Sequence, residues 1–129
     1  MKLTKTTDFG MRILIYLAKQ NELATMPVIS ETLSIPYNNL TKLTQNLAKA
    51  GIIHTKKGKS GGIKLLMKPE DITLKIVVDL IDGPTTLSDC QKSDTLCTLS
   101  CDCKLKDALS SLQKNINNLM TDITVKQLL

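Results

Sequence analysis

The chain has 129 residues, of which 42% are hydrophobic, and a formal net charge of +5. Its length suits one domain, or a small domain with an appended helix. Its one Phe, two Tyr and no Trp argue against a stacking platform for single-stranded nucleic acid, because that mode of binding needs aromatic rings. The excess of lysine favours a polyanionic partner.

The N-terminal stretch MKLTKTTDFG lacks the apolar run of a signal peptide, and no window approaches the length of a membrane span. We therefore expect a cytoplasmic protein that does not bind membranes. All four cysteines lie between positions 90 and 103. Cytoplasmic thiols stay reduced unless they bind metal or sense oxidants, so a structural disulfide framework is the weakest explanation of this cluster.

Apolar spacing and capping residues predict three helices in the first part of the chain, at Thr7 to about Gln20, Pro27 to Leu33, and about Pro36 to Ala50. Thr6 or Thr7 can cap the first helix. Thr25 or Met26 stands near the cap of the second, which has Pro27 in its first turn. Gly51 follows the third helix in a position that favours its end.

The third predicted helix has two different faces. Leu40, Leu43 and Leu47 form an apolar stripe that predicts burial. The opposite side carries hydrogen-bonding side chains of the kinds that read base edges, namely Asn38, Thr41, Lys42 and Gln45. Taken by itself, such a stripe is also what an ordinary solvated helix face looks like.

A basic hairpin follows this helix. IIHTKK alternates as a strand does, GKSGG is a glycine-rich turn, and IKLLMK returns as a second strand. Two short helices followed by such a hairpin predict a winged helix-turn-helix, a mainly α fold with a small β-hairpin, that binds double-stranded DNA. The candidate DNA-binding residues are Tyr37, Asn38, Asn39, Thr41, Lys42 and Gln45 on the helix, and Lys56, Lys57, Lys59 and Ser60 on the hairpin.

A fourth helix is predicted from Leu74 to Ile81, capped by Thr73, and a long last helix from about Lys104 to Met120. Apolar residues on the last helix recur at steps of three and four, at Leu105, Ala108, Leu109, Leu112, Ile116, Leu119 and Ile123. This stripe can be covered by its own domain or by a second copy. We favour a homodimer that presents two reading helices to a palindromic operator.

The expected dimerisation residues are Leu105, Leu109, Leu112, Ile116 and Leu119. The predicted organisation is then a DNA-binding domain over residues 1–83, a cysteine-rich loop over 84–103, and a dimerisation helix with a C-terminal tail over 104–129.

The cysteine spacing leaves three kinds of site open. The gaps between Cys90, Cys97, Cys101 and Cys103 contain six, three and one residues, so the paired C-x2-C spacing of structural zinc is absent. A loop with wide gaps suits an iron–sulfur cluster, whose corners lie further apart than four ligands on one ion. An iron–sulfur cluster, a zinc site and a thiol switch remain open at this point, in that order.

Over essentially its whole length, the chain resembles the winged-helix family of bacterial repressors that includes the nitric-oxide sensor NsrR and the cluster-assembly regulator IscR. The resemblance rests on MKLTKTTDFGMRILIYLA, on IPYNNLTKLTQNLAKAGII, on KKGKSGGIKL, on ITLKIVVDLIDGP, and on spaced cysteines followed by KL and a long helix. Each segment alone is weak evidence, but their order along one chain is specific. The family wing often has an arginine where this chain has Lys57. Lysine makes a weaker contact with the minor groove than arginine does.

The resemblance implies a set of cluster ligands. By position, the three family cysteines fall on Cys90, Cys97 and Cys103, with Cys101 as the alternative third ligand. IscR-like members have a histidine where this chain has Lys106, which cannot ligate iron. NsrR-like members use an aspartate near the N-terminus, donated by the partner subunit, and Asp8 stands at that position. The implied cofactor is a 4Fe-4S cluster, with 2Fe-2S left open.

The resemblance also implies a function, that of a dimeric repressor whose cluster senses nitric oxide or another redox signal. A carboxylate is a hard and comparatively labile ligand for iron, so that corner of the cluster is open to a small diatomic molecule. The alternatives are a metal-free thiol-disulfide sensor and a constitutive DNA binder with a structural zinc. An enzyme is not expected, because one histidine and no paired carboxylates offer little for catalysis.

Overall fold

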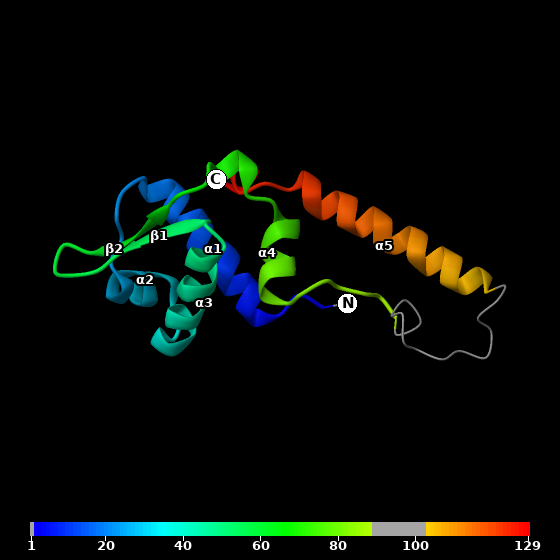
Figure 1. Ribbon diagram of the computed structural model, residues 1–129, viewed down its shortest axis with the longest axis horizontal. Helices are drawn as coiled ribbons and strands as arrows, with labels where there is room; N and C mark the ends of the chain where they lie inside the picture. The colour runs from blue at the N-terminus through cyan, green and yellow to red at the C-terminus, as the bar shows by residue number, and fades with distance from the viewer. Residues whose placement is uncertain (1, 89–102) are drawn as a thin grey trace.

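The computed structural model describes residues 2–88 and 103–129 of the chain. Its elements in chain order are α1 (Lys5–Gln20), α2 (Met26–Leu33), α3 (Tyr37–Lys49), β1 (Ile53–Lys56), β2 (Gly62–Leu65), the short 3-10 helix η1 (Pro69–Asp71), α4 (Leu74–Ile81), α5 (Lys104–Asp122) and the 3-10 turn η3 (Lys126–Leu128). Helices α1 and α3 pack against the hairpin, α2 and α4 pack against α1 and α3, and α5 extends away from them (Figure 1). The predicted mainly α fold with a small β-hairpin is confirmed.

Helix α1 begins earlier than the sequence predicts, and its predicted cap was wrong. The cap is Thr4, whose hydroxyl oxygen accepts a hydrogen bond from the Thr7 amide at 3.2 Å. Thr7 cannot be the cap, because it lies inside the helix, is only 1% exposed, and donates its hydroxyl to Asp82. A contact from a distant part of the chain therefore selects among three neighbouring threonines.

The predicted boundaries of α2 and α3 are confirmed to within one residue. Thr25 stands at the N-cap position of α2 with Pro27 in the first turn, and Pro36 holds the corresponding position before α3. Gly51 follows Ala50, the C-cap residue of α3, with φ of 77°, a left-handed conformation that glycine adopts without steric cost. These local signals set the lengths of both helices.

The hairpin is a two-stranded antiparallel sheet in which Ile53 pairs with Leu65 and Lys56 with Gly62. Strand β2 is fixed to the loop before α2, because the Ala24 amide donates to the Ile63 carbonyl at 2.9 Å and the Ala24 carbonyl accepts from the Ile63 amide at 2.8 Å. The edge of β2 that faces away from β1 is thus hydrogen-bonded at the buried residue Ile63. The tip of the hairpin, residues 57–61, projects beyond this attachment.

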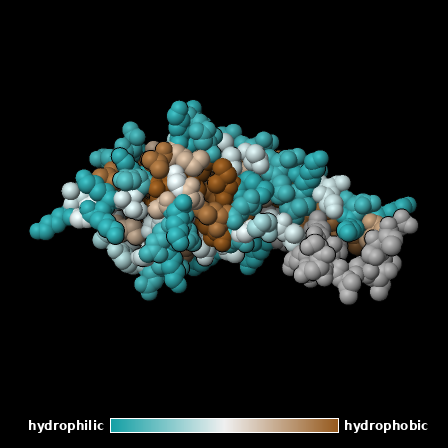
Figure 2. All heavy atoms as spheres, in the orientation of Figure 1, coloured by the Kyte–Doolittle hydropathy of each residue, from teal (hydrophilic) through white to brown (hydrophobic). Residues whose placement is uncertain are grey.

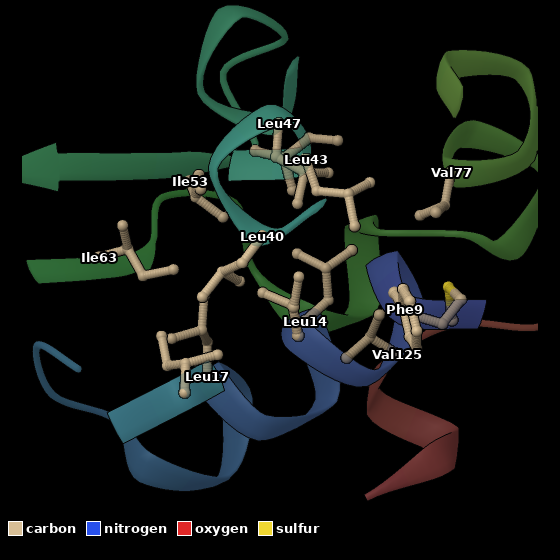
Figure 3. Packing of buried hydrophobic residues seen from close by; sticks show 14 of the residues in the cluster. Phe9, Leu14, Leu17, Leu40, Leu43, Leu47, Ile53, Ile63, Val77 and Val125 are labelled. Carbon is tan, nitrogen blue, oxygen red and sulfur yellow. The ribbon is translucent and has the colours of Figure 1, made fainter. Parts of the chain in front are cut away.

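The hydrophobic core lies where α1, α3 and the hairpin meet (Figure 3). Leu14 of α1, Leu40 and Leu47 of α3, and Ile53 and Ile63 of the hairpin are no more than 2% exposed. The predicted apolar stripe of α3 is therefore buried as expected. This packing fixes which face of α3 is left for other contacts.

The C-terminal tail returns to the first domain and anchors α5. The Leu74 amide donates to the Ile123 carbonyl at 2.8 Å, and the Val125 amide donates to the Ile72 carbonyl at 2.9 Å. Val125 is fully buried in the core. Helix α5 is therefore held at its C-terminal end, and its 19 residues carry its N-terminal end about 28 Å away.

Gly62 provides a test of the hairpin's attachment. A Cβ at this position would lie 2.5 Å from the Ala24 carbonyl oxygen, a backbone atom held by the paired hydrogen bonds. Replacing Gly62 with Ala should therefore lower the free energy of unfolding by about 1–3 kcal/mol, measured by urea denaturation. The control Lys64→Ala, on the exposed side of the same strand, should change it by no more than about 0.5 kcal/mol. Equal effects of the two changes would contradict the close packing.

Candidate functional site

The face of α3 opposite the core is exposed and polar. Asn38, Lys42 and Gln45 are exposed along it, and Tyr37 in its first turn is 52% exposed. The helix is held by leucines on one side only, so these side chains are free to meet a ligand. This is the arrangement by which a recognition helix enters the major groove of DNA.

A groove of about 570 Å³ separates α3 from the hairpin. It is lined by Thr25, Met26 and Pro27 before and at the start of α2, by Tyr37, Thr41, Thr44 and Gln45 of α3, and by Thr55, Lys56, Gly58, Lys59, Gly61, Gly62 and Ile63 of the hairpin. None of these lining residues is acidic. We refer to it as the reading groove.

The tip of the hairpin carries the positive charge that the sequence predicts. Lys56 stands at the end of β1, and Lys57, Lys59 and Ser60 follow in the exposed turn. Figure 2 shows hydrophilic residues covering this end of the molecule. Ammonium groups at an exposed tip beside a groove are placed to neutralise phosphates along a duplex.

The hydroxyl of Thr41 has a restricted role in the reading groove. It donates to the Tyr37 carbonyl at 3.0 Å, one turn earlier in α3. Its proton is therefore engaged, and what remains for a ligand is an accepting oxygen and a methyl group. A threonine methyl group can contact the methyl group of thymine.

The structure brings together only part of the predicted DNA-binding set. Tyr37, Thr41, Gln45, Lys56 and Lys59 line the reading groove. Asn39 and Lys42 instead line a second depression, of about 280 Å³, together with Thr6 of α1, Leu43 and Asn46. Lys57, Ser60 and Asn38 are exposed nearby but line neither.

Sequence reasoning missed several lining residues. Thr55 lies on β1 facing the groove, and Thr25 and Pro27 reach it from the start of α2. Strand alternation could have singled out Thr55, since Ile53 two positions earlier is buried at the end nearer the core. Nothing local could place Thr25 there, because the groove forms only when α2 packs beside the hairpin.

A second candidate site begins at the start of α5. Cys103 is the N-cap residue, and its half-buried sulfur accepts a hydrogen bond from the Lys106 amide at 3.4 Å. A cysteine sulfur is a soft ligand of the kind that zinc and iron–sulfur clusters take, so Cys103 is of the right chemical type for a metal ligand. The other predicted ligands Cys90 and Cys97, and the alternative Cys101, lie outside the described residues.

Asp8, the predicted oxygen ligand, lies in the first turns of α1 with 52% of its side chain exposed. Its Oδ2 accepts from Nε of Arg12 at 2.9 Å, one helical turn on. An exposed carboxylate in a surface ion pair can change partners at low cost. Within residues 2–88 and 103–129, no three Cys, His, Asp or Glu side chains form a group able to hold a metal ion.

The start of α1 is tied to the end of α4. Asp82 accepts hydrogen bonds from the hydroxyl of Thr4 at 2.6 Å, the hydroxyl of Thr7 at 2.7 Å, and the amide of Thr4 at 3.4 Å. Burial alone would raise the pKa of Asp82, but these three bonds outweigh it and hold the pKa below the ordinary value. The carboxylate therefore contributes stability above the ordinary aspartate pKa, and this is lost as pH falls through the lowered value.

The apolar stripe of α5 divides into two faces. Leu105, Leu112 and Leu119, spaced seven residues apart, are 66%, 48% and 63% exposed. Leu109 and Ile116 are half-buried, and Ile123 is the residue after the helix rather than part of it. A heptad of leucines is thus left uncovered in the single chain.

The charged and apolar surfaces lie on different elements. Apolar residues gather over α4 on the face shown in Figure 2. Among the residues of α4, Ile76 is 39% exposed. No helix among the described residues is long and apolar enough to cross a bilayer.

Comparison with known proteins gives a consistent family. The profile of the Rrf2 family, described as iron-dependent transcriptional regulator, matches residues 3–129. The HTH-type transcriptional regulator NsrR of Shouchella clausii is 37% identical over 131 residues, covering 99% of this chain and 88% of that protein. NsrR of Halalkalibacterium halodurans is 36% identical over 132 residues, covering 100% and 90%.

Solved structures show the same fold. CymR, the global cysteine regulator of B. subtilis, superposes with a TM-score of 0.81 at 21% identity, covering 99% of this chain and 95% of that one. IscR of T. potens superposes with a TM-score of 0.77 at 19% identity, covering 99% and 85%. At these sequence identities the solved structures support the fold alone.

The hairpin tip and the α3 wall of the reading groove are predicted to have separate roles in DNA binding. Replacing both Lys57 and Lys59 with Ala should weaken binding to every duplex, and should reduce the slope of log affinity against log salt by up to about 0.9 per lost phosphate contact. Fluorescence anisotropy over a salt series would measure this. An unchanged slope would contradict the assignment of the hairpin tip to phosphates.

Two variants serve as controls for this measurement. The pair Lys64→Ala and Lys68→Ala removes the same charge from residues that line a different hollow beside α1, so the slope should change less. Gln45→Ala on the α3 wall should instead reduce discrimination between operator and random DNA, by roughly 1–3 kcal/mol for a lost base contact.

Proposed function

The chain belongs to the Rrf2 family of iron-dependent transcriptional regulators, and from this we propose that it is a dimeric repressor whose iron–sulfur cluster senses nitric oxide and controls operator binding. As a member of this family it is a DNA-binding transcriptional regulator and not an enzyme. The observation that carries the proposal is that two features occur in the same chain: a reading groove bordered by lysines, and a cysteine sulfur at the N-cap of a separate helix, α5.

The reading groove would receive double-stranded DNA. In this proposal α3 enters the major groove with Tyr37, Asn38, Asn39, Thr41, Lys42 and Gln45 towards the bases and the adjacent backbone. Lys56, Lys57, Lys59 and Ser60 of the hairpin meet phosphates or the neighbouring minor groove. The absence of acidic side chains from the groove lining supports this, because a polyanion would be repelled by them.

A second copy of the chain would cover α5. Leu105, Leu112 and Leu119 have the heptad spacing of a helix–helix seam, and the half-buried Leu109 and Ile116 would widen it. The apolar surface over α4 would gain cover from the same partner. A two-fold dimer places its two reading grooves for a palindromic operator.

The cluster would be held by Cys90, Cys97 and Cys103, with Asp8 as the fourth ligand and a 4Fe-4S core preferred to 2Fe-2S. When bound, the cluster would supply iron that reacts with nitric oxide. Three soft thiolates secure the iron, while the hard carboxylate is the ligand most easily displaced. The exposed position of Asp8 and the N-cap position of Cys103 both fit these roles.

The geometry of α5 favours donation of Asp8 by the partner subunit. In Figure 1 the start of α5 lies at the far end of the molecule from α1, so these two elements of one chain do not meet. A second copy packed along α5 would bring its own α1 closer. On this proposal residues 1–83 read DNA, residues 84–103 sense, and residues 104–129 pair the subunits.

Leu112 tests the seam. Replacing it with Asp places a charge in the centre of the leucine heptad, so the variant should sediment as a monomer. Its affinity for the full operator should be no higher than its affinity for a single half-site. Asn118→Asp introduces a carboxylate at an exposed position about 120° around the helix axis from Leu112. This variant should stay dimeric. A dimeric Leu112→Asp protein would refute the proposed seam.

The ligand set is tested by anaerobic purification, with visible absorption, iron and sulfide content, and operator affinity before and after nitric oxide. The wild type should be coloured and should release DNA on treatment. Cys90→Ser, Cys97→Ser and Cys103→Ser should each lose the cluster, whereas the matched change Cys101→Ser should keep most of it. A colourless protein with bound zinc, or one without metal, would refute the cluster and favour a structural zinc or a thiol sensor.

Asp8 should behave differently from the cysteines. Asp8→Ala leaves three thiolates, so the cluster should assemble, but the link between subunits is lost and operator affinity should no longer respond to nitric oxide. Asp71→Ala, another exposed carboxylate, is the control and should respond normally. A cluster that survives in Cys103→Ser but not in Cys101→Ser would move the third ligand to Cys101.

A further inference from the structure

Asp82 occupies a junction that the proposed function leaves unexplained. It follows the last residue of α4, where its own amide bonds to the Val78 carbonyl at 2.8 Å. Its carboxylate reaches 75 and 78 residues back to Thr7 and Thr4. The chain leaves this point directly for the cysteine-rich segment, so Asp82 joins the start of that segment to the start of α1.

The same contacts organise the first turn of α1. The Thr4 hydroxyl accepts from the Thr7 amide as the helix cap while it donates to Asp82. The Thr4 carbonyl accepts from the amide of Asp8 at 3.1 Å, the first bond of the helix. The orientation of Thr4 therefore depends on the Asp82 carboxylate, and the backbone position of Asp8 depends on Thr4.

The junction continues into a tight helix crossing. Gly10, one turn after Thr7, packs so closely that a Cβ there would lie 2.6 Å from Cδ1 of Ile81 and 3.9 Å from Leu43 of α3. Thr6 shares the wall of the second depression with Asn39 and Lys42 of α3. Since close-packed elements transmit displacement, movement of the first turn of α1 is passed on to α3.

We propose that Asp82 is a positioning residue that holds Asp8, the start of the cysteine segment and the recognition helix in one fixed relation, so that a change at the cysteines reaches α3. The proposal rests on the proposed function and deepens it. Without this junction, a change of coordination would be taken up by movement between α1 and α4.

The chemistry of the junction requires a carboxylate. Two hydroxyl protons and one amide proton converge on Asp82, and both of its oxygens accept. An asparagine has one accepting oxygen and an NH2 group that can only donate. Asp82→Asn must therefore leave the Thr4 or Thr7 hydroxyl without its acceptor, with almost no change of volume.

The first measurement uses the metal-free full-length protein and needs no cluster. Hydrogen exchange of the peptide covering residues 2–12 should become faster in Asp82→Asn by roughly tenfold, because bonds to a charged acceptor are lost from the start of α1. Thr7→Val should have the same effect, and Thr7→Ser, which keeps the hydroxyl, should be close to wild type. Asp79→Asn alters the carboxylate that pairs with Lys75 on the same helix, and should leave this peptide unchanged.

The second measurement is the ratio of operator affinities with and without iron and sulfide. Couplings of this kind are roughly 5- to 150-fold, and in Asp82→Asn and Thr7→Val the ratio should fall below about threefold while metal-free binding persists. Thr7→Ser and Asp79→Asn should keep the wild-type ratio.

Two results would overturn the proposal: wild-type exchange of residues 2–12 in both Asp82→Asn and Thr7→Val, or a wild-type affinity ratio in both. If the operator affinity of the wild-type protein is the same with and without iron and sulfide, the proposed function is refuted, and the positioning role with it. Failure of the junction alone is recognised by a responsive wild type and equally responsive variants.

Discussion

The burial of α1 is the constraint on which the positions of the other elements depend. This helix packs against α2, α3, α4, β2 and the C-terminal turn, and Ile13 and Leu14 at its centre are fully buried. A close-packed interior does not deform continuously, so α1 cannot tilt without moving α3 or α4. The reading face of α3 and the segment that leads to the cysteines therefore share one rigid support, and neither can be placed independently of the other.

The surface divides into areas that differ in chemistry. Lysines border a groove at the hairpin, whereas uncovered leucines lie on α5, a helix attached to the domain at its C-terminal end. Separation of this kind would let DNA phosphates and the proposed second subunit bind without competing for the same surface. The buried faces of α3 and α5 decide which side chains are left outside: Leu43 and Met120 point inward, so Lys42 and Leu119 beside them stay available.

Much of the fold could be predicted because the residues that begin and end its helices act locally. Thr25 with Pro27 marks the start of α2, Gly51 the end of α3, and Thr73 the cap of α4, each through the backbone geometry of its own neighbourhood. The cap of α1 could not be predicted, because Thr4, Thr6 and Thr7 are locally equivalent and the choice depends on Asp82.

The candidate site was predictable in the same uneven way. The charged tip at Lys59 follows from composition and hairpin pattern, but the contribution of Thr25 to the groove requires the packing of α2 beside β2. The leucine periodicity of α5 predicts an apolar stripe, yet not that Leu112 stays uncovered while Ile116 is partly covered. That difference depends on the return of Val125 to the core, which fixes the rotation of α5 about its axis.

The distance between the two ends of α5 has a consequence for how the regulator would respond to its own abundance. If the thiolates and the carboxylate of one site come from different copies, the site obeys the mass action of a bimolecular complex. Occupancy by the cofactor and self-association then reinforce each other, since ligation holds two chains together. At low copy number the chains would be both monomeric and without cofactor, and a rise in synthesis would convert both properties at once. Repression would then set in over a narrow range of protein concentration.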